Sequence, residues 1–133
     1  MTVLTLSITL ATAAALGIIN LWLAARIVPM RLRDDVLIGD GGDDRLAGRM
    51  RAQANLVEYA PFVLVLLALI ELARGSGMVL GVVAALFVVA RIAHPVGMDL
   101  RRSNLPRAGG ALLTWLVLAF LAGWAALIAA GIA

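Results

Sequence analysis

Cysteine is absent from the 133-residue sequence, and charged residues make up only 14% of it. Without cysteine the chain can form no disulfide, thiol nucleophile or thiolate metal site, so any reactive thiol must come from a substrate. Lysine is absent too, and every basic side chain is arginine, which is the better fork for carboxylates. Apolar residues account for 63% of the chain, far above the globular average, which indicates a protein surrounded mainly by lipid.

Long apolar stretches fill most of the sequence, and each has roughly the 20 residues that a helix needs to cross a bilayer. They predict membrane-spanning helices at about 3–25, 52–73, 78–98 and 109–131. Because runs of Leu, Ala and Val replace the alternating pattern of barrel strands, we expect an all-α four-helix bundle, with residues 1–133 as a single domain. No basic residue precedes the first stretch, which indicates a retained helix rather than a signal peptide.

Basic residues are concentrated in two of the three connections between these helices. The first connection holds Arg26, Arg31, Arg33, Arg45, Arg49 and Arg51, the third holds Arg101, Arg102 and Arg107, and the second holds only Arg74. Since cytoplasmic loops are enriched in arginine, we expect both termini on the non-cytoplasmic side. The net charge is only +3 and five aspartates share the first connection, so a membrane surface or an anionic small molecule is a better partner than nucleic acid.

The centre of the first connection reads Gly-Asp-Gly-Gly-Asp-Asp at residues 39–44, a run of strong turn formers. Its acidic spacing does not match a helix-loop-helix calcium loop, which needs oxygen ligands at alternate positions before its glycine. The run therefore predicts a tight turn and no metal site.

A polar stripe interrupts the second apolar stretch. Arg51, Asn55, Glu58 and Tyr59 fall at i, i+4, i+7 and i+8, so they share one face of the predicted helix. At 1.5 Å per residue, Glu58 lies about 10 Å along the helix from Arg51, which places a carboxylate below the headgroups. An ionisable group at that depth is costly and marks a candidate functional site. Pro61 follows the stripe and predicts a kink.

The third predicted helix carries Arg91 and His94 one turn apart, at a depth comparable with Glu58. Arg91 is the expected partner of Glu58, either in a structural ion pair or in a ligand site. His94 stands alone, which suits a hydrogen-bonded interfacial histidine better than a metal ligand. Pro95 follows it, so we expect the helix to be disturbed there.

Asn20, Glu71 and Arg74 are further polar residues in or next to the apolar stretches. Asn20 predicts a hydrogen bond between helices. Glu71 and Arg74, at i and i+3 near the far end of the second helix, predict an exposed ion pair. Because no polar path joins the stripe to this far end, the pattern disfavours a transporter.

The run RAQANLVEYAP at residues 51–61 resembles the signature of the membrane-associated proteins in eicosanoid and glutathione metabolism, the MAPEG family. That signature reads Arg, three residues, Asn, two residues, Glu-Tyr, one residue, Pro. Further matches that resemble the bacterial branch are Gly-Asp-Gly-Gly at 39–42, Arg91-Ile-Ala-His94 with Gly97, and Arg107-Ala-Gly109. The resemblance covers nearly the whole chain.

The resemblance implies a homotrimer in a bacterial inner membrane, with glutathione sites at the subunit interfaces near the cytoplasmic face. A lipophilic second substrate would arrive from the surrounding membrane lipid. By the family pattern, the residues that would hold glutathione are Arg26, Arg51, Asn55, Glu58, Tyr59, Arg91 and His94. Glutathione presents two carboxylates and an ammonium group, which suit arginine forks and a carboxylate respectively.

Active relatives rely on an arginine near the start of the fourth helix, and some also on a tyrosine, to favour the thiolate of glutathione, which is the nucleophile. By resemblance the catalytic candidates here are Arg102 and Arg107, and Met98 stands where some relatives carry the tyrosine. The leading hypothesis is a membrane glutathione S-transferase or peroxidase that acts on lipophilic electrophiles or hydroperoxides. The alternative is a non-catalytic trimeric protein that binds lipid or a partner and uses the polar stripe as a structural network.

Overall fold

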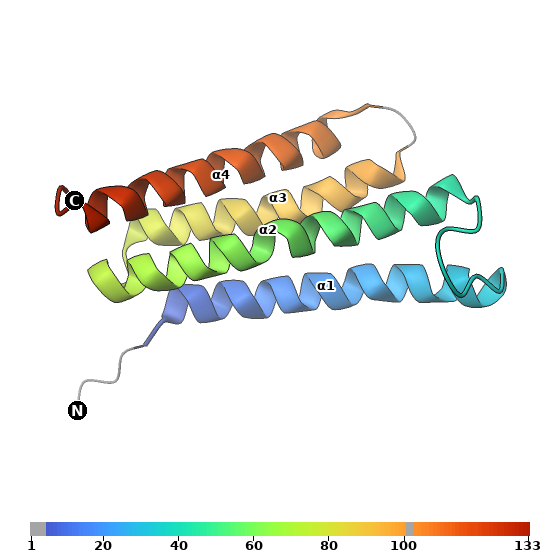
Figure 1. Cartoon of the computed structure of the whole chain (residues 1–133), viewed down its shortest axis with the longest axis horizontal. Coiled ribbons are helices and arrows are strands. Elements are labelled where there is room, and N and C mark those ends of the chain that lie inside the picture. The colour runs from blue at the N-terminus through green and yellow to red at the C-terminus, as the bar shows by residue number, and fades with distance from the viewer. Residues whose placement is uncertain (1–4, 101–102) are drawn as a thin grey trace.

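In the computed structural model, the chain folds into α-helices that run side by side as one bundle (Figure 1). The structure describes residues 5–100 and 103–133. Its helices are α1 (Ser7–Arg33), α2 (Asp44–Arg74), α3 (Met78–Asp99) and α4 (Leu105–Ala129). All four are long and apolar enough to cross a membrane, which confirms the predicted all-α membrane fold.

The first two helices extend well beyond the predicted spans. α1 continues to Arg33 and α2 begins at Asp44, so the connection between them covers only residues 34–43. The Asp43 side chain accepts hydrogen bonds from the first backbone N–H groups of α2 and so fixes its start. With 31 residues α2 is about 46 Å long, whereas the hydrocarbon core measures about 30 Å. The apolar part of the sequence ends near the lipid boundary, but backbone hydrogen bonds and the Asp43 cap extend α2 beyond it.

The connection at residues 34–43 contains the predicted tight turn. The glycines at 39, 41 and 42 adopt positive φ angles of 73°, 62° and 81°, and the Asp40 carboxylate accepts a hydrogen bond of 3.0 Å from the backbone N–H of Gly42. Just after α1, the hydrogen bond that Arg33 donates to Asp34 lowers the pKa of the Asp34 carboxyl. This ion pair is exposed to solvent, so it contributes little to stability.

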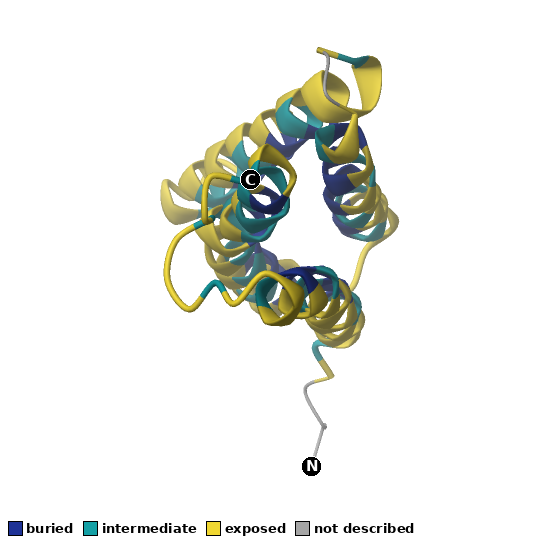
Figure 2. Ribbon diagram, turned by 90° about the vertical axis from the view of Figure 1, so that its right-hand side faces the viewer, coloured by how far each residue is buried: buried dark blue, intermediate teal, exposed yellow. Residues whose placement is uncertain are grey.

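The bundle core is built around α2 and α3. Both of these helices pack against each other, against α1 and against α4, whereas α1 and α4 do not meet within the described ranges. Figure 2 shows the buried residues facing the interior and the exposed residues facing outward on every helix. Leu23, Leu67, Phe87 and Leu121 bring one large apolar side chain from each helix into this core.

The ends of the bundle differ in charge. The connection at residues 34–43 and the described residues between α3 and α4 lie at one end of the bundle (Figure 1). It is called here the arginine-rich end, because Arg31 and Arg33 end α1 there and Arg45 and Arg49 lie in the first turns of α2. The start of α1, the end of α4 and the short connection at residues 75–77 lie at the other, the terminal end. α2 and α3 continue through Pro61 and Pro95 respectively.

At the terminal end, Glu71 is buried rather than exposed, so the predicted Glu71–Arg74 surface pair was wrong. The Glu71 carboxylate accepts hydrogen bonds of 2.9 Å from the backbone N–H groups of Ile8 and Thr9, 2.7 Å from the Thr9 hydroxyl and 2.6 Å from the Ser76 hydroxyl. The N-cap residue of α1 makes no side-chain hydrogen bond of its own. Glu71 therefore caps α1 from the neighbouring helix, where its negative charge also complements the helix dipole.

Candidate functional site

The outward face of α2 carries an ion pair between two residues of the predicted stripe. Arg51 donates a hydrogen bond of 2.9 Å to Glu58, and their side chains are 62% and 46% exposed. The prediction that Glu58 pairs with Arg91 was therefore wrong. Arg51 and Glu58 are separated by nearly two full turns, so they lie on the same side of α2 and the long arginine side chain spans the gap.

Arg91 instead occupies a buried polar cluster between α2, α3 and α4. It donates hydrogen bonds to the Asn55 side-chain oxygen at 2.5 Å, to the Gly110 carbonyl at 2.9 Å and to the Thr114 hydroxyl. Its guanidinium also lies over the Phe87 ring, 5.7 Å from the centroid. Arg91 is only 2% exposed, and none of the described carboxylates forms an ion pair with it. Neutral oxygens and one aromatic ring therefore solvate this cation.

His94 lies one turn after Arg91 and is buried against the start of α4. Its Nδ1 atom and the Arg91 Nε atom are buried and have no hydrogen-bond partner within residues 5–100 and 103–133. Unpaired buried polar atoms are uncommon in folded proteins. The cluster can therefore accommodate a further polar contact.

Tyr59, the last residue of the stripe, is linked to α4. Trp115 donates a hydrogen bond of 2.9 Å from its indole nitrogen to the Tyr59 hydroxyl. Tyr59 is half-buried and Trp115 is exposed, so an aromatic pair lies at the bundle surface, adjacent in sequence to Glu58.

Arg26 lies in a separate ionic cluster at the arginine-rich end. It donates a hydrogen bond to Asp99, the last residue of α3, and stacks over the Trp22 ring at 4.8 Å from the centroid. Arg49 lies 3.6 Å from the same carboxylate and donates to the Arg26 carbonyl at 2.7 Å. Within one chain, Arg26 therefore ties α1 to α3, and its hydrogen bond and ion pair in the described residues go to Asp99 rather than to the stripe of α2.

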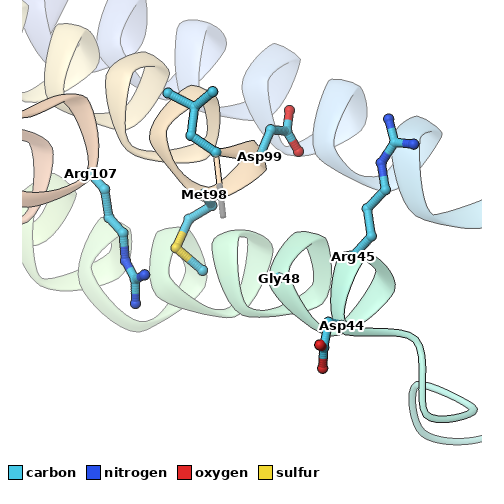
Figure 3. Close-up of a pocket in the computed structure, with 7 residues that line it drawn as sticks. Asp44, Arg45, Gly48, Met98, Asp99 and Arg107 are labelled. Atoms are coloured by element: carbon cyan, nitrogen blue, oxygen red, sulfur yellow. The ribbon is translucent and has the colours of Figure 1, made fainter. Parts of the chain in front are cut away.

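The two arginines considered for thiol activation can be compared only in part, because Arg102 lies outside the described residues. Arg107 is near the start of α4, which Asn104 caps by accepting a hydrogen bond of 2.9 Å from the Arg107 backbone N–H. Together with Met98, Arg107 lines a cavity of about 630 Å³ between α2, α3 and α4 (Figure 3).

Several polar partners were not identified from the sequence. Thr114 is a lone hydroxyl in an apolar stretch, four residues after Gly110, and that isolation was the available signal. Asp99 is the one acidic residue of the third connection, which made it a natural partner for arginine. The predicted role of Asn20 was correct, because Gln53 of α2 donates to its side-chain oxygen at 3.1 Å.

Comparison with known proteins agrees with this architecture. The sequence model of the MAPEG family matches residues 9–127. Inner membrane protein YecN of Escherichia coli strain K12 is 28% identical over 92 residues, which are 69% of this chain and 70% of that protein, and its counterpart in Escherichia coli O6:H1 matches equally. No solved structure gives a significant match. Since the family match runs from the first turn of α1 almost to the end of α4 in a bundle of apolar helices, the chain belongs to the MAPEG family.

Proposed function

We propose that this integral membrane protein is a glutathione S-transferase or peroxidase that acts on lipophilic electrophiles or hydroperoxides. It works as a homotrimer in a bacterial inner membrane, with its arginine-rich end in the cytoplasm and both termini outside. Membership of the MAPEG family supports this proposal, and so does the inner-membrane relative. The observation that carries it is the outward-facing ion pair of Arg51 and Glu58 on a membrane-spanning helix.

An exposed ion pair at this position in a membrane-spanning helix must be shielded from lipid. Glu58 lies six residues inside the predicted span that begins at residue 52, or about 9 Å along the helix. A charged side chain within a membrane costs at least a few kcal/mol unless it faces protein or a water-filled cavity. Within one protomer Glu58 faces outward, so a neighbouring copy would have to cover it. This favours a polar site at the subunit interface.

The chemistry of the pair fits glutathione. The Arg51 guanidinium is a fork for one of the two carboxylates, and the Glu58 carboxylate is a partner for the ammonium group. Tyr59 adds a hydroxyl beside them, and Arg26 of a neighbouring subunit supplies a second guanidinium. Arg91 acts indirectly, because it holds the oxygen of Asn55 and thereby turns the amide N–H groups toward the ligand.

Arg107 is the proposed thiolate-stabilising cation, because Met98 beside it has no hydroxyl. Arg102 is the second candidate. With an electrophile, the thiolate forms the new carbon–sulfur bond, the leaving group departs with the bonding electron pair, and the thiol proton goes to water. With a hydroperoxide, sulfur attacks the outer oxygen and the O–O bond breaks to give the alcohol and a sulfenic acid. The thiol of a second glutathione then attacks the sulfur of this acid, so that the S–O bond breaks and glutathione disulfide and water are released.

Calorimetric titration of the detergent-purified protein with glutathione tests the binding step. We expect saturable binding in the wild type and in Arg74→Ala, which removes an exposed arginine at the terminal end, and loss of binding in Arg51→Ala and Glu58→Ala. All variants must retain the helical circular dichroism of the wild type. No binding by the folded wild type would rule out the transferase and peroxidase assignment.

The non-catalytic alternative is favoured by one observation, the solvation of Arg91 by side-chain and backbone oxygens and one aromatic ring of the chain itself. Conjugation of glutathione to a chloronitrobenzene separates the two functions. An enzyme-dependent rate that Arg107→Gln lowers supports the transferase, whereas binding without turnover supports the non-catalytic protein.

A further inference from the structure

A large cavity opens at the arginine-rich end, beyond the polar stripe. It has a volume of about 630 Å³ and lies between the first turns of α2, the end of α3 and the start of α4 (Figure 3). Arg45 and Gly48 line it from α2, Met98 and Leu100 from the end of α3, and Arg107 from α4. Neither Arg51 nor Glu58 borders it, so the cavity is distinct from the proposed glutathione pair.

The cavity has an excess of positive charge. Arg45 and Arg107 are exposed, and their side chains have no hydrogen-bond or ion-pair partner in the described part of the chain. Of the two carboxylates on the wall, that of Asp99 is already shared by Arg26 and Arg49. Counting these groups together gives four arginines against two aspartates, the second being Asp44 at the start of α2. An anion is therefore the favoured occupant.

The depth of the cavity matches the phosphates of a bilayer. Gly48 lies four residues before the predicted span that begins at residue 52, or about 6 Å from its start along α2. The headgroup layer on each side of a membrane is about 5–8 Å thick. Met98 and Leu100 add apolar surface to the cavity wall, as the base of an acyl chain requires.

We propose that this cavity binds the headgroup of an anionic glycerophospholipid. Arg107 holds its phosphodiester, Arg45 contacts the far end of the headgroup, and the Asp44 carboxylate accepts hydrogen bonds from headgroup hydroxyls. Figure 3 shows the two arginines on opposite sides of Met98, so an extended polyol headgroup reaches both better than a bare phosphate does. Basic pockets between membrane helices bind anionic lipids in this way. The cavity shares Arg107 with the proposed glutathione chemistry, whereas Arg45 and Asp44 belong to the lipid site alone, so Arg45→Gln distinguishes the two proposals.

Titration of the full-length protein in neutral detergent with short-chain phosphatidylglycerol tests the site. Calorimetry gives the affinity, and intrinsic tryptophan fluorescence gives the shift in unfolding temperature. We expect Arg45→Gln and Arg107→Gln each to weaken binding about fivefold, the equivalent of about 1 kcal/mol per arginine. Arg74→Gln, at the terminal end, removes the same charge and should leave the affinity unchanged. Gly48→Leu keeps both arginines but places an apolar side chain in the cavity, and it should also weaken saturable binding.

The same titrations can overturn the proposal. Equal binding of short-chain phosphatidylcholine or phosphatidylethanolamine would show that the cavity does not select an anion. An equal loss in Arg74→Gln and Arg45→Gln would reveal only general charge attraction. If inorganic phosphate binds as tightly as the lipid, the cavity recognises phosphate alone and not a lipid headgroup. Competition by glutathione would assign the cavity to the glutathione site instead, whereas failure of glutathione to bind anywhere leaves the lipid site untouched.

Discussion

Removal of the Glu71 carboxylate should loosen the terminal end of the bundle. Glu71→Ala deletes an acceptor that receives four hydrogen bonds, from the backbones of Ile8 and Thr9 and the hydroxyls of Thr9 and Ser76. A hydrogen bond to a charged group contributes about 1.5–3 kcal/mol, and loss of a helix cap costs about 1 kcal/mol. These contributions are not additive, because donors at a helix end regain water. We therefore expect the free energy of unfolding to fall by about 3 kcal/mol.

Glu71→Gln should lose about 2 kcal/mol, since one oxygen acceptor remains but the new amide N–H₂ faces groups that are themselves donors. Titration with sodium dodecyl sulfate in mixed micelles, followed by fluorescence of the three tryptophans, measures both losses. Arg74→Ala lies one turn away, is exposed, and should change stability by less than about 0.5 kcal/mol. If Glu71→Ala proves as stable as Arg74→Ala, the carboxylate does not cap α1 and the reasoning fails.

The remaining predictions concern close backbone contacts and the buried cation. A Cβ at Gly110 would lie 2.9 Å from a backbone oxygen of α3, so Gly110→Ala should lower the free energy of unfolding by about 2 kcal/mol. A Cβ at Gly109 would meet no atom within 4 Å, so Gly109→Ala should not destabilise the protein. Equal melting temperatures for the two variants would contradict this prediction. Thr114→Val leaves buried Arg91 without one acceptor and should cost about 1–3 kcal/mol in the same detergent titration, whereas Thr114→Ser should retain most of the stability. Gly41→Ala must adopt a φ of +62°, so limited proteolysis should cut the connection at residues 34–43 faster than in the wild type.

The number and type of helices could be predicted because a bilayer leaves the chain few choices. Each span must satisfy its own backbone hydrogen bonds over a fixed thickness, so long apolar stretches can only be helices. The turn at residues 39–42 was predictable for a similarly local reason, since only glycine adopts those positive φ angles at little cost.

The role of Glu71 could not be read in the same way, because its partners are far away in the sequence. Ile8 and Thr9 donate mainly through backbone N–H groups, which no side-chain pattern reveals, and they lie 63 and 62 positions from Glu71. Arg74, its neighbour at i+3, was the local partner that helical spacing suggested. Glu71 stabilises the protein more by capping α1 than it would in an exposed ion pair, because such a pair contributes almost nothing to stability.

The four residues of the polar stripe were predicted to share one face of α2, but they lie in two environments, the outer surface and the bundle interior. At about 100° per residue, Arg51 and Glu58 differ by only about 20° around α2, whereas Asn55 and Tyr59 lie about 40° and 80° further round from Arg51. That spread is enough to turn Arg51 and Glu58 outward while Asn55 reaches Arg91 in the bundle interior. Helical periodicity identifies a face, but the packing of α3 and α4 decides which part of it is covered.

The partners of Arg91 change how Glu58 should be interpreted. From the sequence, a buried ion pair between Glu58 and Arg91 explained both charges without any ligand. The structure removes that explanation, because neutral oxygens of Asn55, Gly110 and Thr114 solvate Arg91. Glu58 is then left with Arg51 alone, exposed, on a helix that crosses the membrane. An exposed pair contributes little to the stability of the protomer, so stability alone does not account for a carboxylate at this depth. Binding of a charged group that arrives from outside the protomer accounts for it better.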